Sequence, residues 1–369
     1  MNPGLTREIS PGPIALFGSG ETSPSGRKIF EAVFRRLPEQ PVVALLETPA
    51  GFELNSAEVI ERIGQFITQR LQTYQPKIVI VPARMRGTEF SPDDPAIVQP
   101  LYEADLIFMG PGSPSYAVRQ LKDSLAWAII MARHRAGAAL ALASAAVIAI
   151  GTYALPVYEI YKVGEDLHWV HGLDLLGYYG VHLVMLPHWN NQDGGQTLDT
   201  SRCFIGQGRF ERMLELLPSD LTVVGIDEKT GLVIDPPRGS CEVIGSGGVT
   251  LVPVSQGGQE AVRDRGLDLP RFGPGAMFSL SKLGVFDLPP AGVDLPSEVW
   301  QKAQERRLIQ QGSIRPEKSP SHQVLRLVRQ REQARIEKDW PAADRLREEL
   351  ENLGWRVKDT PHGSILESH

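Results

Sequence analysis

The sequence predicts an α/β protein with a mostly parallel sheet, helices on both faces and a helical hairpin at the C-terminal end. Three observations lead to this fold class. In the first two thirds of the chain, short apolar runs alternate with amphipathic segments, as strands alternate with the helices that join them. Several of the apolar runs end in a Gly-rich or Ser-containing turn. Residues 321–369 instead show two helical stretches that follow one another directly.

The apolar runs have the composition of buried strands. They are rich in Val, Ile, Leu and Ala, and Gly, Pro or Ser residues bound them. Strands buried on both faces of a parallel sheet form continuous apolar runs, whereas half-exposed strands alternate. The expected strands lie within residues 13–20, 41–51, 77–83, 105–115 and 138–144.

The segments between these runs have helical spacing. In residues 26–37, Ile29, Val33 and Leu37 recur on one side of the expected helix. Because each such segment has one apolar side, we expect these helices to cover the two faces of the sheet. The other expected helices lie in residues 55–74 and 116–137.

Composition divides the chain into three parts. Residues 1–255 carry the alternating pattern of an α/β domain. Residues 256–320 are rich in Pro and Gly, which is typical of an arm or linker. Residues 321–369 form the expected helical hairpin, in which Pro341 fits the first turn of the second helix. Because of the Pro-rich break, a chain that ends near Pro316 is expected to fold without the hairpin.

Charge and cysteine content favour a cytoplasmic protein. The formal net charge of -6 gives no overall basic surface for nucleic acid. Cys203 and Cys241 are too few for a disulfide framework, so a reducing compartment is expected. The N-terminal residues lack a signal pattern, and the longest apolar run, around residues 138–150, is too short for a membrane span. Assembly into a homo-oligomer stays open.

A lone serine interrupts the small apolar run AALALASAAVIAIGTY, residues 138–153. Ser144 is either a small core residue at the end of a strand or a nucleophile on a tight strand-to-helix turn. In the second case its backbone is expected in a strained region with φ above zero. Gly18–Gly20 and Gly110–Gly112 also follow expected strands. All three turns are therefore expected at the edge of the sheet where ligands bind.

A serine nucleophile needs a base and an acid that orients the base. Among the histidines, His134 lies in a charged helix end and is expected in solvent. His168 and His171 flank a tryptophan in an expected edge strand or hairpin, and His182 lies within an apolar run. His188 follows that run and precedes a polar, Gly-rich loop. This is a suitable place for a catalytic base, and a structural loop histidine is the alternative.

The sequence contains no spacing typical of a metal site, such as C-x-x-C or H-x-x-x-H. His188 and Asp193 alone make a weak pair of ligands. Cys203 is expected to be a buried, inert thiol, because nothing near it in the sequence would lower its pKa. We expect neither a metal nor another cofactor.

Several short segments follow one another in a distinctive order. They read FGSG, FMGPGSPSYAVRQL, the serine turn, GLDLLGYYGVHLVMLPHW, GRFERMLELL and GIDEKTGLVID. In this order, over about residues 13–253, they resemble the cyanophycinase and dipeptidase E family of serine peptidases, peptidase family S51. The resemblance implies a class I glutamine amidotransferase-like fold, with flavodoxin-like layers. It also implies a serine-type hydrolase that cleaves an amide bond in a small peptide or peptide-like substrate.

The resemblance assigns catalytic roles to individual residues. Ser144 corresponds to the nucleophile, and His188, which an aromatic residue follows, corresponds to the base. In that family an acidic residue lies between the two, a short way after the serine. Glu159 is the candidate, with Glu165 and Asp166 as alternatives.

The resemblance also assigns the oxyanion hole to the N–H groups of Gly112 and Ala145. Gly18, Ser113 and Asp227 are candidates for contact with the substrate. Asp227 lies in the segment GIDEKTG, where an acidic residue either binds a substrate amine or caps a turn.

The C-terminal segment LRLVRQREQARIEKDWPAADRLREELENLGWRVKDTPHG resembles the helical tail of cysteinyl-tRNA synthetases. No ATP-binding signature or zinc cysteines accompany it, so the chain is not expected to charge tRNA. From Ser321 to His369 nine Lys and Arg balance nine Asp and Glu, so nucleic acid is not expected as a partner. A docking module is the preferred interpretation. The apolar positions expected to pack against one another are Val324, Leu325, Val328, Leu346, Leu350 and Leu353.

The segments near the expected site differ from the family pattern. Leu142 and Ala146 stand where the family usually has glycines, and Pro111 and Ser113 replace Gly and Asn in the oxyanion turn. Three functions therefore stay open. A serine-type hydrolase is the preferred one. The alternatives are a non-catalytic ligand-binding protein of the same fold and a tRNA- or synthetase-linked binding module.

Overall fold

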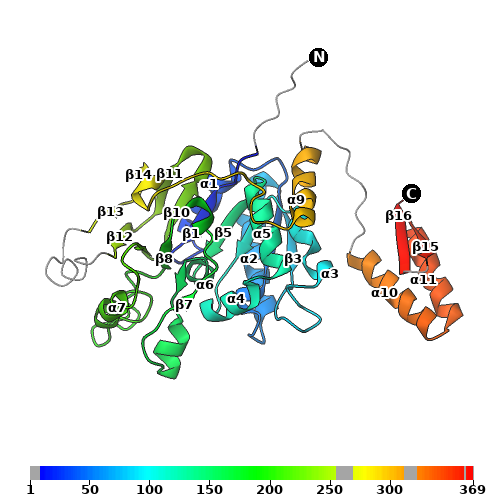
Figure 1. Cartoon of the computed structure of the whole chain (residues 1–369), viewed down its shortest axis with the longest axis horizontal. Helices are drawn as coiled ribbons and strands as arrows, with labels where there is room; N and C mark the ends of the chain where they lie inside the picture. Colours follow the sequence, from blue (N-terminus) through cyan, green and yellow to red (C-terminus); the bar gives the residue numbers. More distant parts are fainter. Residues whose placement is uncertain (1–8, 255–268, 311–321, 361–362, 369) are drawn as a thin grey trace, which may run out of the picture. The chain divides into compact units, whose positions relative to one another are not determined.

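A computed structural model describes residues 9–254, 269–310, 322–360 and 363–368 of the chain (Figure 1). The chain divides into two compact units, Met1–Arg307 (unit 1) and Leu308–His369 (unit 2). Unit 1 includes residues 269–307, which belong to the segment expected as an arm or linker. Residues 255–268 and 311–321 lie outside the described residues. These ranges include the rest of that segment except residues 308–310, and the second range contains Pro316.

The larger sheet of unit 1 confirms the predicted fold class. Five strands, from β1 to the edge strand β3 in the order below, are parallel, and the remaining three extend the other side of the sheet in antiparallel fashion. The spatial order is β14 (Met277–Ser279), β11 (Ser240–Gly245), β10 (Thr230–Asp235), β1 (Ile14–Phe17), β5 (Ala139–Ala143), β4 (Leu106–Met109), β2 (Val42–Leu46) and β3 (Lys77–Val81).

Helices cover both faces of this sheet, which gives three layers. Successive residues of one strand point to opposite faces, so Phe17 packs in one core and Leu16 in the other. The core that contains Phe17 lies under α1 (Pro24–Phe34) and α2 (Ser56–Arg70). The core that contains Leu16 lies under α4 (Pro114–Leu121), α5 (Leu125–Arg135) and α6 (Ala145–Ala149).

The strands of a second, six-stranded sheet are interleaved in the chain with the last three strands of the first. In the second sheet, β8 and β9 are parallel neighbours, and Leu186 is in register with Gly225. The segments after these two strands therefore begin side by side. The spatial order is β13 (Arg271–Phe272), β12 (Val249–Pro253), β9 (Thr222–Ile226), β8 (Leu183–Leu186), β6 (Tyr153–Ala154) and β7 (Val170–His171).

Further helical segments complete unit 1. Within the described ranges, every helix is too short or too polar to cross a membrane. A π-helical turn, η4 (Glu159–Val163), follows β6. The remaining helical segments are η1 (Thr48–Ala50), η2 (Gln72–Tyr74), α3 (Pro95–Val98), η3 (Gln99–Glu103), η5 (Gly177–Tyr179), α7 (Gln207–Leu214), η6 (Pro236–Arg238), η7 (Leu280–Lys282) and α9 (Ser297–Gln310).

Unit 2 contains the expected helix pair and a strand pair that the sequence analysis did not anticipate. The helices are α10 (His322–Ile336) and α11 (Trp340–Asn352), and the antiparallel strands are β15 (Trp355–Thr360) and β16 (Gly363–Ser368). Of the expected apolar positions, Val324, Val328 and Leu350 are buried, whereas Leu353 is exposed. The strand pair supplies Trp355 and Val357 to the core of unit 2.

His134 is not in solvent, as its charged neighbours had indicated, but fully buried. Its Nε2 atom lies 2.7 Å from the Tyr179 hydroxyl oxygen. Burial lowers the pKa of His134 to about 3 and raises that of Tyr179. The histidine is therefore neutral in the folded protein at neutral pH.

Candidate active site

Ser144 occupies the turn between β5 and α6. Its φ is 51° and its ψ is -112°, which confirms the predicted strain at this residue. The chain can turn sharply here because the flanking residues Ala143, Ala145 and Ala146 are small, and all three are buried. Leu142 packs in the core on the α6 side of the sheet, so it does not allow the close approach of helix and strand that a glycine would allow. The turn therefore presents the serine hydroxyl at the carboxyl edge of the sheet.

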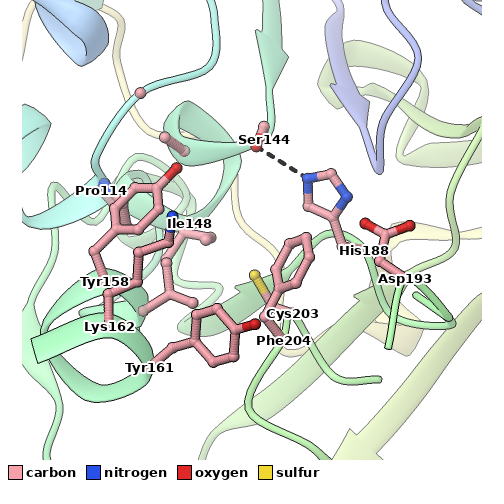
Figure 2. A pocket seen from close by; sticks show the side chains of 13 residues that line it. Pro114, Ser144, Ile148, Tyr158, Tyr161, Lys162, His188, Asp193, Cys203 and Phe204 are labelled. Atoms are coloured by element: carbon pink, nitrogen blue, oxygen red, sulfur yellow. Dashed lines mark hydrogen bonds between the residues drawn. The ribbon is translucent and has the colours of Figure 1, made fainter. Parts of the chain in front are cut away.

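His188 lies two residues beyond the end of β8, and its Nε2 atom is 3.0 Å from Ser144 Oγ (Figure 2). Its backbone also has positive φ, 51°. The turn is fixed by main-chain hydrogen bonds, because His188 N–H donates to Gly18 O and Trp189 N–H donates to Ile226 O. The structure thus brings together the two residues that the sequence analysis named as nucleophile and base.

Glu228 provides the carboxylate beside the histidine. Its Oε1 atom lies 3.1 Å from His188 Nδ1. The buried Asn191 side chain donates to the same Oε1 atom at 2.9 Å, and Asn190 Oδ1 accepts from Glu228 N–H at 2.8 Å. Asn191 therefore holds the carboxylate beside the ring of His188, and Asn190 holds the main chain of Glu228.

The structure corrects the assignment of Glu159 as the orienting acid. The Glu159 carboxylate accepts a hydrogen bond from the Ser115 hydroxyl, not from His188. The alternatives do not take the place either, since Glu165 lies 3.9 Å from His168 and the Asp166 carbonyl contacts His168. The physical reason is the register of β8 and β9. It places the segment after Ile226 beside the histidine, whereas Glu159 lies on η4.

The two expected oxyanion donors, Gly112 and Ala145, both line the cavity at Ser144. Among the described residues, neither N–H group donates to a protein acceptor. Gly112 has a φ of 145°, and a Cβ atom there would lie 1.9 Å from Pro49 O. Ser113 N–H donates to the same carbonyl at 2.9 Å. Glycine is thus required for the turn to pack against η1 with its own N–H group free.

The cavity next to Ser144 has a volume of about 390 Å³. Figure 2 shows Tyr158, Lys162 and Pro114 on one side of it and His188 with Asp193 on the other. Cys203 also lines the cavity, but its side chain is buried as expected, and this burial raises the pKa of the thiol to about 12. The remaining lining residues are Gly112, Ser144, Ala145, Ile148, Val157, Tyr161 and Phe204.

The three residues predicted to contact substrate do not line this cavity. Asp227 is buried and forms an ion pair with Arg271, so it is a structural residue. Gly18 accepts from His188 N–H, and a Cβ atom there would lie 2.0 Å from Asp227 O. Ser113 caps α4 by accepting from Tyr116 N–H. Gly18 and Ser113 therefore support the neighbours of the cavity rather than line it, and contact of these three residues with a substrate stays a prediction.

The fold and these contacts define unit 1 as a three-layer α/β domain with a Ser–His–Glu arrangement at the carboxyl edge of its strands. The chain is similar in structure to a peptidase from an acI-B1 Actinobacterium, with a TM-score of 0.56 and 22% identity. The match covers 73% of this chain and 98% of that chain. At this identity the similarity establishes a shared fold, and at that level it confirms the first resemblance.

The second resemblance is confirmed by a family model. Residues 321–363 match the cysteinyl-tRNA ligase anticodon binding domain. Over 47 residues the chain is 55% identical to cysteine–tRNA ligase 1 of Burkholderia lata, which is 13% of this chain and 10% of the ligase. Over 44 residues it is 52% identical to the cysteine–tRNA ligase of Rubrobacter xylanophilus, 12% of this chain and 9% of the ligase. The chain thus matches about a tenth of the length of these curated relatives.

Proposed function

We propose that unit 1 is a serine-type hydrolase that cleaves an amide bond in a small peptide or peptide-like substrate. The observation that carries this proposal is the contact series Ser144 Oγ, His188 Nε2, His188 Nδ1 and Glu228 Oε1, with distances of 3.0 and 3.1 Å. In this series each group has the neighbour that its role requires.

The proposed reaction follows from these contacts. Ser144 attacks the carbonyl carbon while His188 takes the hydroxyl proton. The N–H groups of Gly112 and Ala145 donate to the oxygen that becomes negative, and His188 then protonates the leaving amine. Water attacks the acyl-serine in a second step, which releases the acid and restores the serine hydroxyl. Glu228 keeps His188 in the tautomer that has Nε2 free to accept the proton, and it stabilises the imidazolium.

A fluorophosphonate probe tests this proposal on the intact chain. We expect the probe to label Ser144, with the labelled peptide identified by mass spectrometry, and the Ser144→Ala variant to show no labelling. Alanine already occupies both neighbouring positions, so this variant should retain the fold. A protein that binds a small ligand without turnover, the competing function, would leave Ser144 unlabelled in a folded wild-type chain.

Unit 2 favours a second function, contact with tRNA. The supporting observation is the match of residues 321–363 to an anticodon binding domain. Helix α10 carries four arginines and one glutamate. Arg326 and Arg329 are exposed, whereas Arg331 is buried, so part of the positive charge of this balanced segment lies on the surface of one helix. Trp340 is 56% exposed at the start of α11, where its ring is accessible for stacking on a base.

Binding of fluorescent tRNA at several salt concentrations tests this second function. Because the segment is charge-balanced overall, we expect weak binding with a shallow salt dependence. Trp340→Ala should weaken it roughly tenfold, since stacking on one aromatic contributes about 1–3 kcal/mol. Leu216→Ala, which removes a similarly exposed apolar side chain from unit 1, is the matched control. Equal affinity of the wild type and Trp340→Ala would argue against this surface.

A further inference from the structure

Two opposite charges lie on different sides of the nucleophile in the cavity. The Asp193 carboxylate accepts a hydrogen bond from Asn191 Nδ2 at 3.0 Å, and Asp193 N–H donates to Asn191 Oδ1 at 3.1 Å. Asn191 is only 2% exposed, so it holds Asp193 in place from below the surface. In the described part of the chain no cationic side chain pairs with Asp193. The site therefore offers a fixed carboxylate to a positively charged group of the substrate.

The opposite side of the cavity carries Lys162 and two tyrosines, all on or next to the π-helical turn η4. Lys162 Nζ lies 5.8 Å from the centroid of the Tyr158 ring, and no carboxylate of the described residues pairs with it. The Tyr161 ring lies 6.0 Å from that of Phe204, centroid to centroid. Aromatic faces beside a lysine suit a planar base next to a phosphate.

We propose that the substrate of Ser144 is an aminoacyl ester at the 3′ end of a tRNA. This proposal rests on the catalytic residues and on the contact with tRNA proposed above, and it changes the bond that is cleaved from an amide to an ester. An aminoacyl ester presents an α-ammonium group for Asp193 and an ester carbonyl for Ser144. Its terminal nucleoside presents a base for Tyr158 or Tyr161 and a phosphate for Lys162. A zwitterionic dipeptide would satisfy the two charges, but it would use neither the tyrosine faces nor unit 2.

The reaction is a hydrolysis and needs only water as a second reactant. The Ser144 oxygen forms a bond to the ester carbonyl carbon, and the bond from that carbon to the ribose oxygen breaks. His188 carries the serine proton to the ribose oxygen, which leaves as a free hydroxyl group. Water then attacks the acyl-serine, and its proton passes through His188 to Ser144. The products are a free amino acid and an uncharged tRNA.

A tRNA-binding segment on the same chain would raise the local concentration of this substrate. Once unit 2 holds a tRNA, encounter of its 3′ end with unit 1 becomes intramolecular, and linked binding of this kind increases affinity without new contacts. We therefore expect the protein to prefer charged tRNA to a small ester, and we expect this preference to depend on unit 2. This preference distinguishes the proposed substrate from a dipeptide.

The experiment measures hydrolysis by the full-length protein of two substrates. They are cysteine tRNA charged with radiolabelled cysteine and the p-nitrophenyl ester of alanine. We expect cysteine release at least about 100-fold faster than with Ser144→Ala. Trp340→Ala and Tyr161→Ala should each lower the ratio of kcat/KM for charged tRNA to kcat/KM for the small ester by roughly tenfold. Leu216→Ala should leave this ratio unchanged.

Different results would overturn different parts of the proposal. Ser144-dependent hydrolysis of the small ester or of dipeptides, without faster release from charged tRNA, would overturn the tRNA ester and leave the hydrolase intact. A wild-type protein that hydrolyses no ester or peptide and takes up no fluorophosphonate would overturn the hydrolase itself. Release from charged tRNA that is equal in wild type and Trp340→Ala would overturn the contribution of unit 2.

Discussion

Glu228 is the residue on which the orientation of His188 depends. We expect Glu228→Gln to lower kcat by about 10³–10⁴-fold, because an amide can hold the imidazole in the wrong tautomer and cannot stabilise the imidazolium. The amide retains an oxygen for the Asn191 side chain, so the fold should be unaffected. Steady-state hydrolysis of the small ester measures this effect.

Glu159→Gln is the matched control for that substitution. It makes the same chemical change at a carboxylate that bonds to Ser115 rather than to His188. Its effect on kcat should stay within about tenfold, as for a residue that acts only through packing of the cavity wall. Equal losses in the two variants would contradict the assignment of Glu228.

The residues of the site were predictable to different degrees. Ser144 and His188 follow their strands directly, and a residue just past a parallel strand lies at the ligand-binding edge wherever the strand sits in the sheet. The role of Glu228 depends instead on which strands are neighbours, and a single sequence does not contain that information. The acidic pair in GIDEKTG, which directly follows β9, was the available signal. Its second member contacts His188, and its first member is buried.

Burial of His134 makes stability depend on pH. The pKa of its side chain is about 3 in the folded protein and near 6.5 in an unfolded chain, so between these values the unfolded state binds the extra proton. Stability from this group is complete above about pH 6.5 and falls as the pH decreases, by up to about 1.4 kcal/mol per pH unit. Urea unfolding between pH 4 and pH 8 should show this slope.

His134→Gln tests the origin of the slope, because glutamine does not titrate. We expect a weaker dependence of the free energy of unfolding on pH below 6.5, whatever the stability of the variant at neutral pH. If the free energy of unfolding depended on pH equally in the wild type and in His134→Gln, other groups would be responsible for the slope.

At the scale of elements, α9 belongs to the segment 256–320, which its Pro and Gly content had predicted to be an arm or linker. The helix is strongly polar, yet Val299 and Ala303 are buried against unit 1. Its attachment relies on arginines, since Arg306 bonds to Asp105 through two nitrogens and Arg133 donates to Ala303 O. Hydrogen bonds between guanidinium groups and carbonyl or carboxylate oxygens leave no hydrophobic period in the sequence, so the docking of α9 was not visible there.

Removing the Arg306 side chain should destabilise unit 1 without affecting its chemistry. The Asp105 carboxylate is almost fully buried, and Arg306→Ala would remove its ion pair with the Arg306 guanidinium. We expect a loss of roughly 2–3 kcal/mol in urea unfolding. This is less than for a fully buried pair, because the Arg306 side chain is 21% exposed. Fluorophosphonate labelling of Ser144 in native buffer should proceed at the wild-type rate. An unchanged unfolding midpoint would show that α9 contributes little to the stability of unit 1.

At the scale of the whole molecule, each unit has its own core. Unit 1 buries two apolar clusters on the two faces of its main sheet, and unit 2 buries a small cluster that includes Val324, Leu350 and Trp355. Because each unit has an apolar core of its own, each is expected to unfold as its own cooperative transition. The division between the α/β part and the hairpin was predictable because composition changes sharply there. The strand pair of unit 2 was missed although Trp355 and Val357 alternate with polar residues and are buried, because the resemblance of this segment to a helical tail led to the expectation of helices alone.

Truncation at Pro316 tests this organisation. The shortened chain keeps α9 and every residue of the proposed catalytic machinery, so it should fold and be labelled at Ser144 by fluorophosphonate at the full-length rate. Its calorimetric transition should lie within about 3 °C of the unit 1 transition in the full chain, because loss of unit 2 should cost under about 1 kcal/mol. Hydrolysis of the small ester should persist, whereas any preference for charged tRNA should disappear. A truncated chain that aggregates would show that unit 2 is needed to fold unit 1. One that folds but is no longer labelled would show that the tail takes part in building the site at Ser144.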